Sequence, residues 1–227
     1  MRVVGVDGCK GGWVAITWDT DVSGSDEALS ARVHTSFQAL LDAYRDTAAI
    51  GVDIPIGLGA GEPRRCDLEA RKAVVPKGSS VFPAPDSRFL EAFNQANIAE
   101  HAYERALSIA HEHMGNGISK QTFYICSKIA EVNLIMKPAY QDRIVEIHPE
   151  VSFWAMAGGR PMEYPKRKQA GYEERQRLLE DTLNVSIWPR KVAFNVARPA
   201  KPDDLLEAVV AAWTARRVAE HNAQRLP

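Results

Sequence analysis

The N-terminal segment predicts a β-hairpin that carries one acidic residue beside its turn. An apolar run over Val3–Val6 leads to Asp7, three glycines surround the turn that follows, and a second apolar run begins at Trp13. Glycine supplies the backbone conformations that a tight turn between two strands needs. A carboxylate at the end of a buried strand is energetically costly unless it is paired, hydrogen-bonded or bound to a metal ion. Asp7 is therefore a candidate functional residue, and other parts of the chain must supply its partners.

A second apolar run also ends in an acidic residue. Residues 48–58 predict a strand buried on both faces, with Asp53 near its end. Before it, Arg32–Thr35 predicts a third strand and Phe37–Arg45 predicts an amphipathic helix. The order strand, strand, strand, helix, strand occurs in ribonuclease-H-like domains, in which the first and fourth strands are parallel neighbours. We therefore expect Asp53 to meet Asp7.

The remainder of the chain predicts a large helical insertion, one more strand and further helices. Residues 59–142 show helical patterns without strand signal, residues 143–148 return to a strand pattern, and a last helix runs from Pro202 to about His221. We expect a single α/β domain over residues 1–227, a ribonuclease-H-like mixed five-stranded sheet flanked by helices, with the insertion as a cap between strands four and five. Helix N-caps are predicted at Ser36, Asp86 and Ser119.

Composition and charge argue against several classes of protein. The formal net charge of −1 gives no global support for nucleic-acid binding. No apolar run approaches the roughly 20 residues that a membrane span needs, and the N-terminus lacks the pattern of a signal peptide. Three cysteines without a CxxC pair argue against disulfides and structural zinc. We expect a cytoplasmic protein with no membrane partner, and the sequence leaves its oligomeric state open.

Charge is nevertheless unevenly distributed along the chain. Residues 1–58 contain 8 acidic and 4 basic residues, whereas residues 160–201 contain 10 basic and 5 acidic residues. The basic stretch includes a charged segment over Glu163–Lys168, predicted to be an exposed loop, and an irregular segment over Ile187–Ala200. One interpretation is uneven but solvated helix faces. The other is a basic rim that guides a phosphate-rich substrate toward an acidic centre.

The last predicted helix carries acidic residues near its start. Asp204 and Glu207 are three residues apart and therefore share one face of the helix. Small residues continue this stripe and would let the helix lie close to a sheet: Ala208, Ala211, Ala212 and Ala215. The alternative is that these acids, with Asp203, only stabilise the positive N-terminal end of the helix.

Three or four carboxylates that converge on one point repel each other and require cations. Carboxylate oxygens favour Mg²⁺ or Mn²⁺ over zinc. Two such ions about 3.5–4 Å apart activate water and stabilise the leaving oxygen in phosphodiester hydrolysis. We predict Asp7 as the bridging ligand, with Asp53 and Asp204 each completing the coordination of one ion. Glu207 is predicted to be a catalytic residue, either as a ligand or beside one.

A second group of residues is predicted to be accessory to this site. Glu146 and His148 fall on the same strand face, and Glu150 follows them. The glutamates are either site residues or salt-bridge partners, and His148 either orients a carboxylate, transfers a proton or is structural. Lys10, in the glycine turn, either contacts a substrate phosphate or is simply exposed. Asp203 either shares the acidic site or caps the last helix.

Motifs spread over nearly the whole chain resemble a widespread family of unknown function numbered 429. They are Val6-Asp-Gly-Cys-Lys-Gly-Gly-Trp13, Ile50-Gly-Val-Asp-Ile-Pro-Ile-Gly57, Arg65-Cys-Asp67, Val81-Phe-Pro-Ala-Pro85, Gly117-Ile-Ser-Lys-Gln121, Glu146-Ile-His-Pro-Glu150 and Asp203-Asp-Leu-Leu-Glu-Ala208. That family is described as predicted nucleases with a ribonuclease-H-like fold. The further resemblance to nucleases of the RuvC type implies that Asp7, Asp53 and either Asp204 or Glu207 bind the metal ions.

The carboxylates and the resemblance together lead us to expect a divalent-metal-dependent nuclease or phosphodiesterase. Its substrate would be nucleic acid or a nucleotide-like phosphodiester, contacted by Arg71, Gln121 and Lys128. The main alternative is a non-catalytic nucleic-acid-binding or nucleotide-binding protein on the same fold. A phosphotransferase like the actin-like kinases is the third, but those enzymes use a second Asp/Gly loop, and Gly158–Gly159 has no partner aspartate.

Overall fold

The computed structural model describes residues 1–22, 28–97, 102–115, 117–185 and 200–227. The strands are β1 (Arg2–Cys9), β2 (Gly12–Asp19), β3 (Leu29–His34), β4 (Ala49–Val52) and β5 (Ile144–Glu146). The α-helices that lie outside the segment between β4 and β5 are α1 (Phe37–Ala43), α6 (Pro149–Met156), α7 (Gln169–Leu183) and α9 (Pro202–Ala219). The predicted irregular segment Ile187–Ala200 lies, apart from its last residue, outside the described residues.

The five strands form one mixed sheet in the order β3-β2-β1-β4-β5. β1 and β2 form the predicted antiparallel hairpin, and β3 pairs antiparallel with β2. β4 pairs parallel with β1 on its other side, and β5 pairs parallel with β4. The predicted α/β class is confirmed, with the first and fourth strands as parallel neighbours, and the strand order is consistent with a ribonuclease-H-like arrangement.

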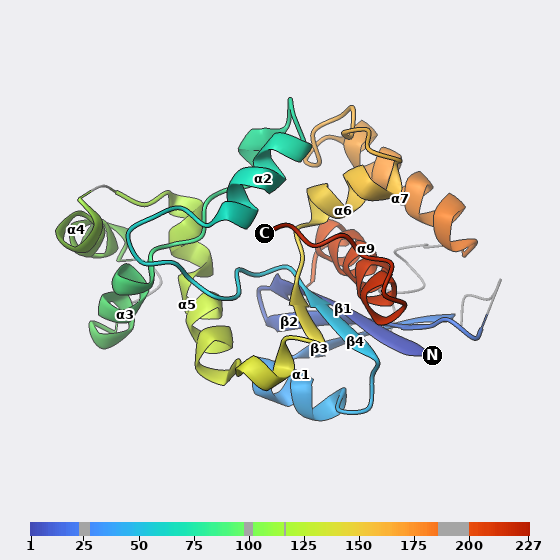
Figure 1. Ribbon diagram of the computed structural model, residues 1–227, viewed down its shortest axis with the longest axis horizontal. Coiled ribbons are helices and arrows are strands. Elements are labelled where there is room, and N and C mark those ends of the chain that lie inside the picture. The colour runs from blue at the N-terminus through green and yellow to red at the C-terminus, as the bar shows by residue number, and fades with distance from the viewer. Residues whose placement is uncertain (23–27, 98–101, 116, 186–199) are drawn as a thin grey trace.

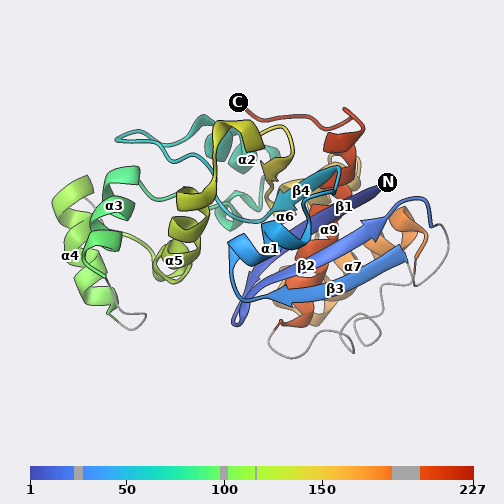
Figure 2. The same cartoon turned by 90° about the horizontal axis from the view of Figure 1, so that it is seen from below.

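Both faces of the sheet are covered by helices because its central strands are apolar on both faces. Alternating residues of β1 supply the two cores: Val3 faces α9, whereas Val4 and Val6 face α1 and the insertion. α9 and α7 cover the first face, and α1 with α5 (Lys120–Ile135) covers the second (Figure 2). A strand that is buried on both faces has a nearly continuous apolar sequence, as the central strands do here.

Between β4 and β5 the described chain is helical, as predicted for the insertion. Its α-helices are α2 (Arg65–Ala73), α3 (Ser87–Gln95), α4 (Tyr103–Met114) and α5, and its short 3₁₀ turns are η2 (Gly78–Ser80) and η3 (Pro138–Tyr140). α3, α4 and α5 form a group beside the sheet (Figure 1). No helix in the described ranges is long and apolar enough to cross a membrane.

The predicted N-caps form in all three places. The side chains of Ser36, Asp86 and Ser119 accept hydrogen bonds from backbone N–H groups in the first turns of α1, α3 and α5. Each cap satisfies one of the backbone donors that a helix leaves unpaired at its N-terminus. These local signals therefore set the starts of three helices.

Glycine in the central strand lets α9 lie directly on the sheet. A Cβ atom built on Gly5 would lie 2.0 Å from the carbonyl oxygen of Ala208 and 2.1 Å from the amide nitrogen of Ala212. One built on Gly51 in β4 would lie 2.7 Å from the carbonyl oxygen of Ala211. No larger residue fits at Gly5 without moving the backbone of α9. The predicted close approach of the small-residue helix face thus depends on two glycines in the sheet.

Candidate metal centre

Asp7 and Asp53 lie side by side at the ends of neighbouring parallel strands. The register pairs Val3 with Ala49 and Gly5 with Gly51, and side chains alternate between the two faces of a sheet. Continuing by two residues places Asp7 and Asp53 on the face that α9 covers. The backbone N–H of Asp53 donates to the carbonyl oxygen of Val6 at 2.9 Å, which extends the pairing to the aspartates.

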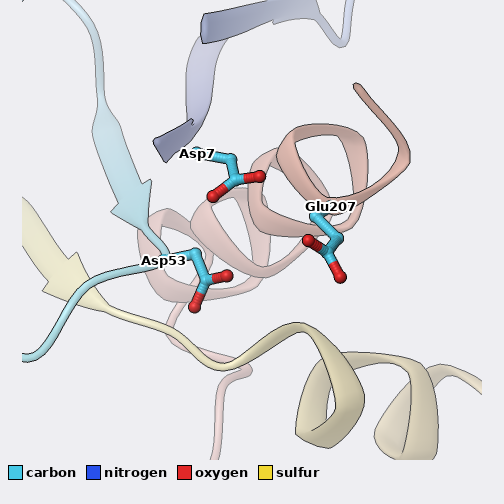
Figure 3. Close-up of side chains that lie close together, drawn as sticks. All are labelled: Asp7, Asp53 and Glu207. Carbon is cyan, nitrogen blue, oxygen red and sulfur yellow. The ribbon is translucent and has the colours of Figure 1, made fainter. Parts of the chain in front are cut away.

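Glu207 completes an acidic triad with these two aspartates. It lies on the first turns of α9, and Figure 3 shows its carboxylate turned toward those of Asp7 and Asp53. One ligand oxygen from each of the three side chains lies within 4.8 Å of the others. Asp7 and Glu207 are buried, with exposed fractions of 7% and 8%. The triad therefore joins two strand ends and one helix in a site largely shielded from water.

The triad is electrostatically strained without a cation. Burial, followed by the carboxylates of Asp53, Glu207 and Asp204, raises the pKa of Asp7 well above its usual range. Burial and the Glu207 carboxylate do the same for the pKa of Asp53. Burial also raises the pKa of Glu207. Like charges in a low-dielectric site destabilise each other, and an added positive charge relieves that repulsion.

One cationic side chain already reaches the triad. Nζ of Lys166 donates a hydrogen bond to Oε1 of Glu207. Burial by itself would lower the pKa of Lys166, but the carboxylates of Glu207, Asp53 and Asp7 raise it above its usual value. The segment Glu163–Lys168 was expected to be an exposed loop, and most of its residues are exposed, but Lys166 folds inward.

Asp204 is close to the triad but its carboxylate is used elsewhere. It accepts a hydrogen bond from the backbone N–H of Lys201 at 2.8 Å, which ties down the N-terminus of α9. Burial raises the pKa of Asp204. The neighbouring Asp203 and the triad line one large cleft, which is described below. Of the acids on α9, the structure thus brings Glu207 to the two aspartates and gives Asp204 a helix-capping contact.

Glu146, at the end of β5, is held in an ion-pair network. Arg64 donates to both of its carboxylate oxygens at 2.7 Å and also to Asp67, at 2.5 and 3.1 Å. The backbone N–H of Ile56 donates to Glu146 as well, at 2.7 Å. Burial opposes the charge of Arg64, but the hydrogen bonds that it donates to Glu146 and Asp67 raise its pKa overall. This network ties the start of α2 to the sheet beside Asp53.

Glu150 and His148 are also placed by the structure. Glu150 forms a buried salt bridge with Arg175 on α7, with its two oxygens 2.7 and 2.9 Å from Nη2 of the arginine. His148 lines the cleft, and burial, with Lys166 adding repulsion, lowers its pKa to about 4. Within the described chain its Nδ1 atom is buried and has no hydrogen-bond partner. The imidazole is therefore neutral at pH 7.

A cleft of about 2170 Å³ opens above the triad, between α5 and the segments that follow α6. It is far larger than the roughly 300–1,000 Å³ of a typical small-molecule pocket. Its lining includes eight acidic residues, the triad among them, and ten lysine or arginine residues, of which six are Lys10, Lys128, Lys166, Arg167, Lys168 and Lys201. An acidic centre in a cleft that also carries many basic side chains suits a polyanionic ligand that binds through a cation.

The residues expected to contact a substrate divide into two groups. Gln121 and Lys128 on α5 line the cleft, as does Lys10 in the β1–β2 turn. Lys128 is partly engaged, since its ammonium donates to the carbonyl oxygen of Gly12 and lies 4.7 Å from the centre of the Trp13 ring. Arg71 is exposed on α2 and is not among the cleft residues.

Sequence reasoning missed Lys166, Arg64 and Arg175, the three cations that pair with the predicted acids. A weak signal existed for Arg64, which stands three residues before Asp67 at the start of a helix, a spacing that favours ion pairs. For Lys166 and Arg175, nothing in the local sequence points to partners 41 and 25 residues away. Their pairing depends on the tertiary fold.

Comparison with known proteins gives a family but no activity. A family model described as "Protein of unknown function (DUF429)" matches residues 5–227. The chain belongs to this family. No curated protein and no solved structure matches it.

The range matched by the family model includes the residues that meet at the centre. The match covers the aspartates at both strand ends, the Glu146–Glu150 segment and α9. The donor set of this family member fits a hard divalent cation, because three convergent carboxylates offer only oxygen ligands and a net negative charge. The structure places no histidine or cysteine ligand in the described triad, which argues against a zinc-type set.

Proposed function

We propose that this chain is a divalent-metal-dependent nuclease that hydrolyses phosphodiester bonds of nucleic acid. The observation that carries the proposal is the convergence of Asp7, Asp53 and Glu207, with one carboxylate oxygen of each within 4.8 Å of the others, in a large cleft that is also lined by basic residues. Bound Mg²⁺ or Mn²⁺ would supply an activated water and stabilise the departing oxygen. A two-ion arrangement suits this chemistry, and Asp204 is the nearest further acid on α9 for a second ion.

The chain's own residues would position the ion and the substrate. Asp7 and Asp53 are fixed by strand pairing, and the Gly8 N–H donates to Oδ1 of Asp7 at 2.6 Å, which leaves the other oxygen free for a ligand. Glu207 approaches from α9, which rests directly on the glycines of the sheet. Ligands held on strands and helices keep their geometry better than ligands on loops. The basic residues that line the cleft would bind the backbone phosphates.

Cleavage assays with Mn²⁺ or Mg²⁺ and labelled DNA and RNA, single-stranded and duplex, test the proposal. We expect cleavage by the wild type and a loss of more than about 100-fold in Asp7→Asn, because loss of a residue that merely supports a metal ligand already costs about 10–100-fold. Asp181→Asn, an exposed aspartate on α7, is the matched control and should retain activity. Full activity in Asp7→Asn would rule out the proposed centre.

A second candidate is a non-catalytic nucleic-acid-binding protein on the same fold. The bond between Lys166 and Glu207 favours it, because a lysine that offsets part of the negative charge of the triad lessens the need for a metal ion. Titration calorimetry with Mn²⁺ separates the two functions. Absence of binding to the wild type supports the binding protein, whereas binding that is lost in Asp53→Asn supports the nuclease.

A further inference from the structure

Tyr124 is a large aromatic side chain left exposed in the wall of the cleft. It is 66% exposed, whereas its neighbour Phe123 is buried at 3%. Both residues line the cleft that holds the acidic triad. Aromatic rings contribute large contact areas when buried, so an aromatic ring exposed inside a cleft is a candidate contact for a ligand.

The Tyr124 ring is supported from beneath by other aromatic side chains. Its centre lies 5.4 Å from that of Phe123, at an interplanar angle of 61°. Phe123 in turn packs against Phe93 and Tyr103, with ring centres 6.1 and 5.5 Å apart. The cluster joins three helices of the insertion and fixes the base on which Tyr124 rests. A ring held in this way loses little conformational entropy when a flat ligand stacks on it.

Gln121, Tyr124 and Lys128 form one face of α5, which we call the α5 strip. Their spacing of three and four residues places them above one another on the same side of a helix. All three line the cleft. A Cβ atom built on Gly8 would lie 2.8 Å from Cδ of Lys128, so the Lys128 end of the α5 strip adjoins the turn after Asp7. The strip therefore leads from an exposed ring to the acidic centre.

The segment before α7 adds positive charge to the cleft. Arg167 and Lys168 are exposed beside Lys166, and all three line the cleft. A cleft with an exposed aromatic ring on α5 and exposed basic residues on another segment matches the two features of single-stranded nucleic acid, which are unpaired base faces and a phosphate backbone. In a duplex the base faces are stacked within the helix and unavailable to a protein side chain.

We propose that the α5 strip binds single-stranded nucleic acid, with an unpaired base stacked on Tyr124 and the phosphates directed toward the acidic triad. The inference rests on the proposed function in taking nucleic acid as the ligand, and it names single strands or unpaired regions as the substrate class. Gln121 is placed to hydrogen-bond a base edge or the sugar. Lys128 is placed to contact a phosphate near the centre.

Fluorescence anisotropy tests this inference in an Asp7→Asn background, so that binding is measured without cleavage. The probes are labelled oligothymidylate, labelled oligouridylate and a duplex of mixed sequence. We expect tighter binding of a single strand than of the duplex. Tyr124→Ala should weaken single-strand binding about tenfold, equivalent to about 1.4 kcal/mol, because stacking on one aromatic side chain contributes about 1–3 kcal/mol per base.

Two control variants test whether the loss of binding is due to the aromatic ring of Tyr124. Tyr124→Phe retains the ring and should bind like its parent. Tyr164→Ala removes another exposed tyrosine, 43% exposed and outside the set of cleft residues, and should also bind like its parent. Comparable losses in Tyr124→Phe and Tyr124→Ala, or unchanged binding in Tyr124→Ala, would overturn the inference.

Cleavage assays of the wild type and of Tyr124→Ala with Asp7 intact, read beside the anisotropy data, separate the inference from the proposed function. Metal-dependent cleavage by the wild type with normal activity in Tyr124→Ala would overturn the inference and leave the nuclease in place. Ring-dependent binding of single strands by a wild type that never cleaves would support the inference and overturn the nuclease. A parent that binds none of the three probes overturns the inference, whatever the cleavage result.

Discussion

Lys166 donates a hydrogen bond to Glu207 and so places a positive charge beside the acidic triad. The lysine comes from the segment before α7, whereas Glu207 lies on α9, 41 residues further along the chain. Its ammonium lies beside carboxylates that would also attract a divalent cation, and Glu207, Asp53 and Asp7 all raise its pKa. The bond therefore makes Lys166 a competitor of any metal ion that Glu207 binds.

Lys166→Met is expected to bind Mn²⁺ more tightly than the wild type. Removal of a positive charge within a few ångströms of the ion relieves repulsion, and we expect a gain of about tenfold or more in affinity at a cost in the stability of the metal-free protein. Titration calorimetry at fixed pH measures it. Lys168→Met, in the same segment, is the control and should leave the affinity nearly unchanged. Equal or weaker binding by Lys166→Met contradicts the competition.

Asp7→Asn is expected to stabilise the metal-free protein at pH 7. Burial and the neighbouring carboxylates raise the pKa of Asp7 in the folded state above the ordinary value of 3.8. A group with a raised folded-state pKa stabilises the protein below its ordinary pKa, and this contribution is lost as the pH rises through the folded-state pKa. As the pH rises above the ordinary value toward the folded-state pKa, the wild type loses this contribution, whereas a neutral amide carries no such penalty.

Thermal unfolding in EDTA between pH 4 and pH 8 measures this effect. The difference in melting temperature between Asp7→Asn and the wild type should be largest at the upper end of this range and should shrink as the pH falls toward 4. Added Mn²⁺ should then stabilise the wild type and leave the variant nearly unchanged. A variant that is less stable than the wild type at pH 7 without metal contradicts the strained triad.

Glu207→Gln is expected to change metal affinity, whereas Asp204→Asn is expected to change stability. Because Glu207 belongs to the triad, Glu207→Gln should weaken Mn²⁺ binding strongly and leave the free energy of unfolding similar or higher. The Asp204 carboxylate bonds to the N–H of Lys201. Loss of such a helix-start contact costs about 0.5–2 kcal/mol, and Asp204→Asn should lower stability more than affinity for the first ion. Calorimetry and urea unfolding of both variants decide this, and the reverse pattern would assign the ligand to Asp204.

Gly5→Ala is expected to destabilise the protein by pushing α9 away from β1 below the acidic triad. The new Cβ would meet backbone atoms of α9 at 2.0 and 2.1 Å, which side-chain rotation cannot relieve. Overpacking of a core costs about 1–3 kcal/mol and more where backbone must move. Gly8→Ala, in the same strand, meets only the flexible Lys128 side chain and should cost less. Equal unfolding free energies for the two variants would contradict the close contact between β1 and α9.

The strand ends of the site could be predicted from the sequence because the signals are local. An apolar run that ends in an acid marks both Asp7 and Asp53, and the order of elements predicts that their strands are neighbours. The caps at Ser36, Asp86 and Ser119 were predicted for the same reason. In each case the residues that determine the structure lie within a few positions of one another.

The acid supplied by the last helix could not be chosen from the sequence. Asp204 and Glu207 share a helix face, and which of them turns into the site depends on how far α9 is rotated and how closely it lies on the sheet. Gly5, Gly51 and the alanines of α9 set both quantities, and they do so only once the sheet is assembled. Lys166 was missed for a similar reason, because a charged segment rich in exposed residues gives no sign that one lysine folds inward.

Anomalous diffraction from crystals soaked in Mn²⁺ tests the metal centre most directly. We predict a manganese peak bounded by Asp7, Asp53 and Glu207, with Lys166 displaced from Glu207, and no peak at that position in crystals of Asp7→Asn. An ordered triad without manganese, with Lys166 still bonded to Glu207 at saturating Mn²⁺, would contradict the proposed centre and the nuclease built on it.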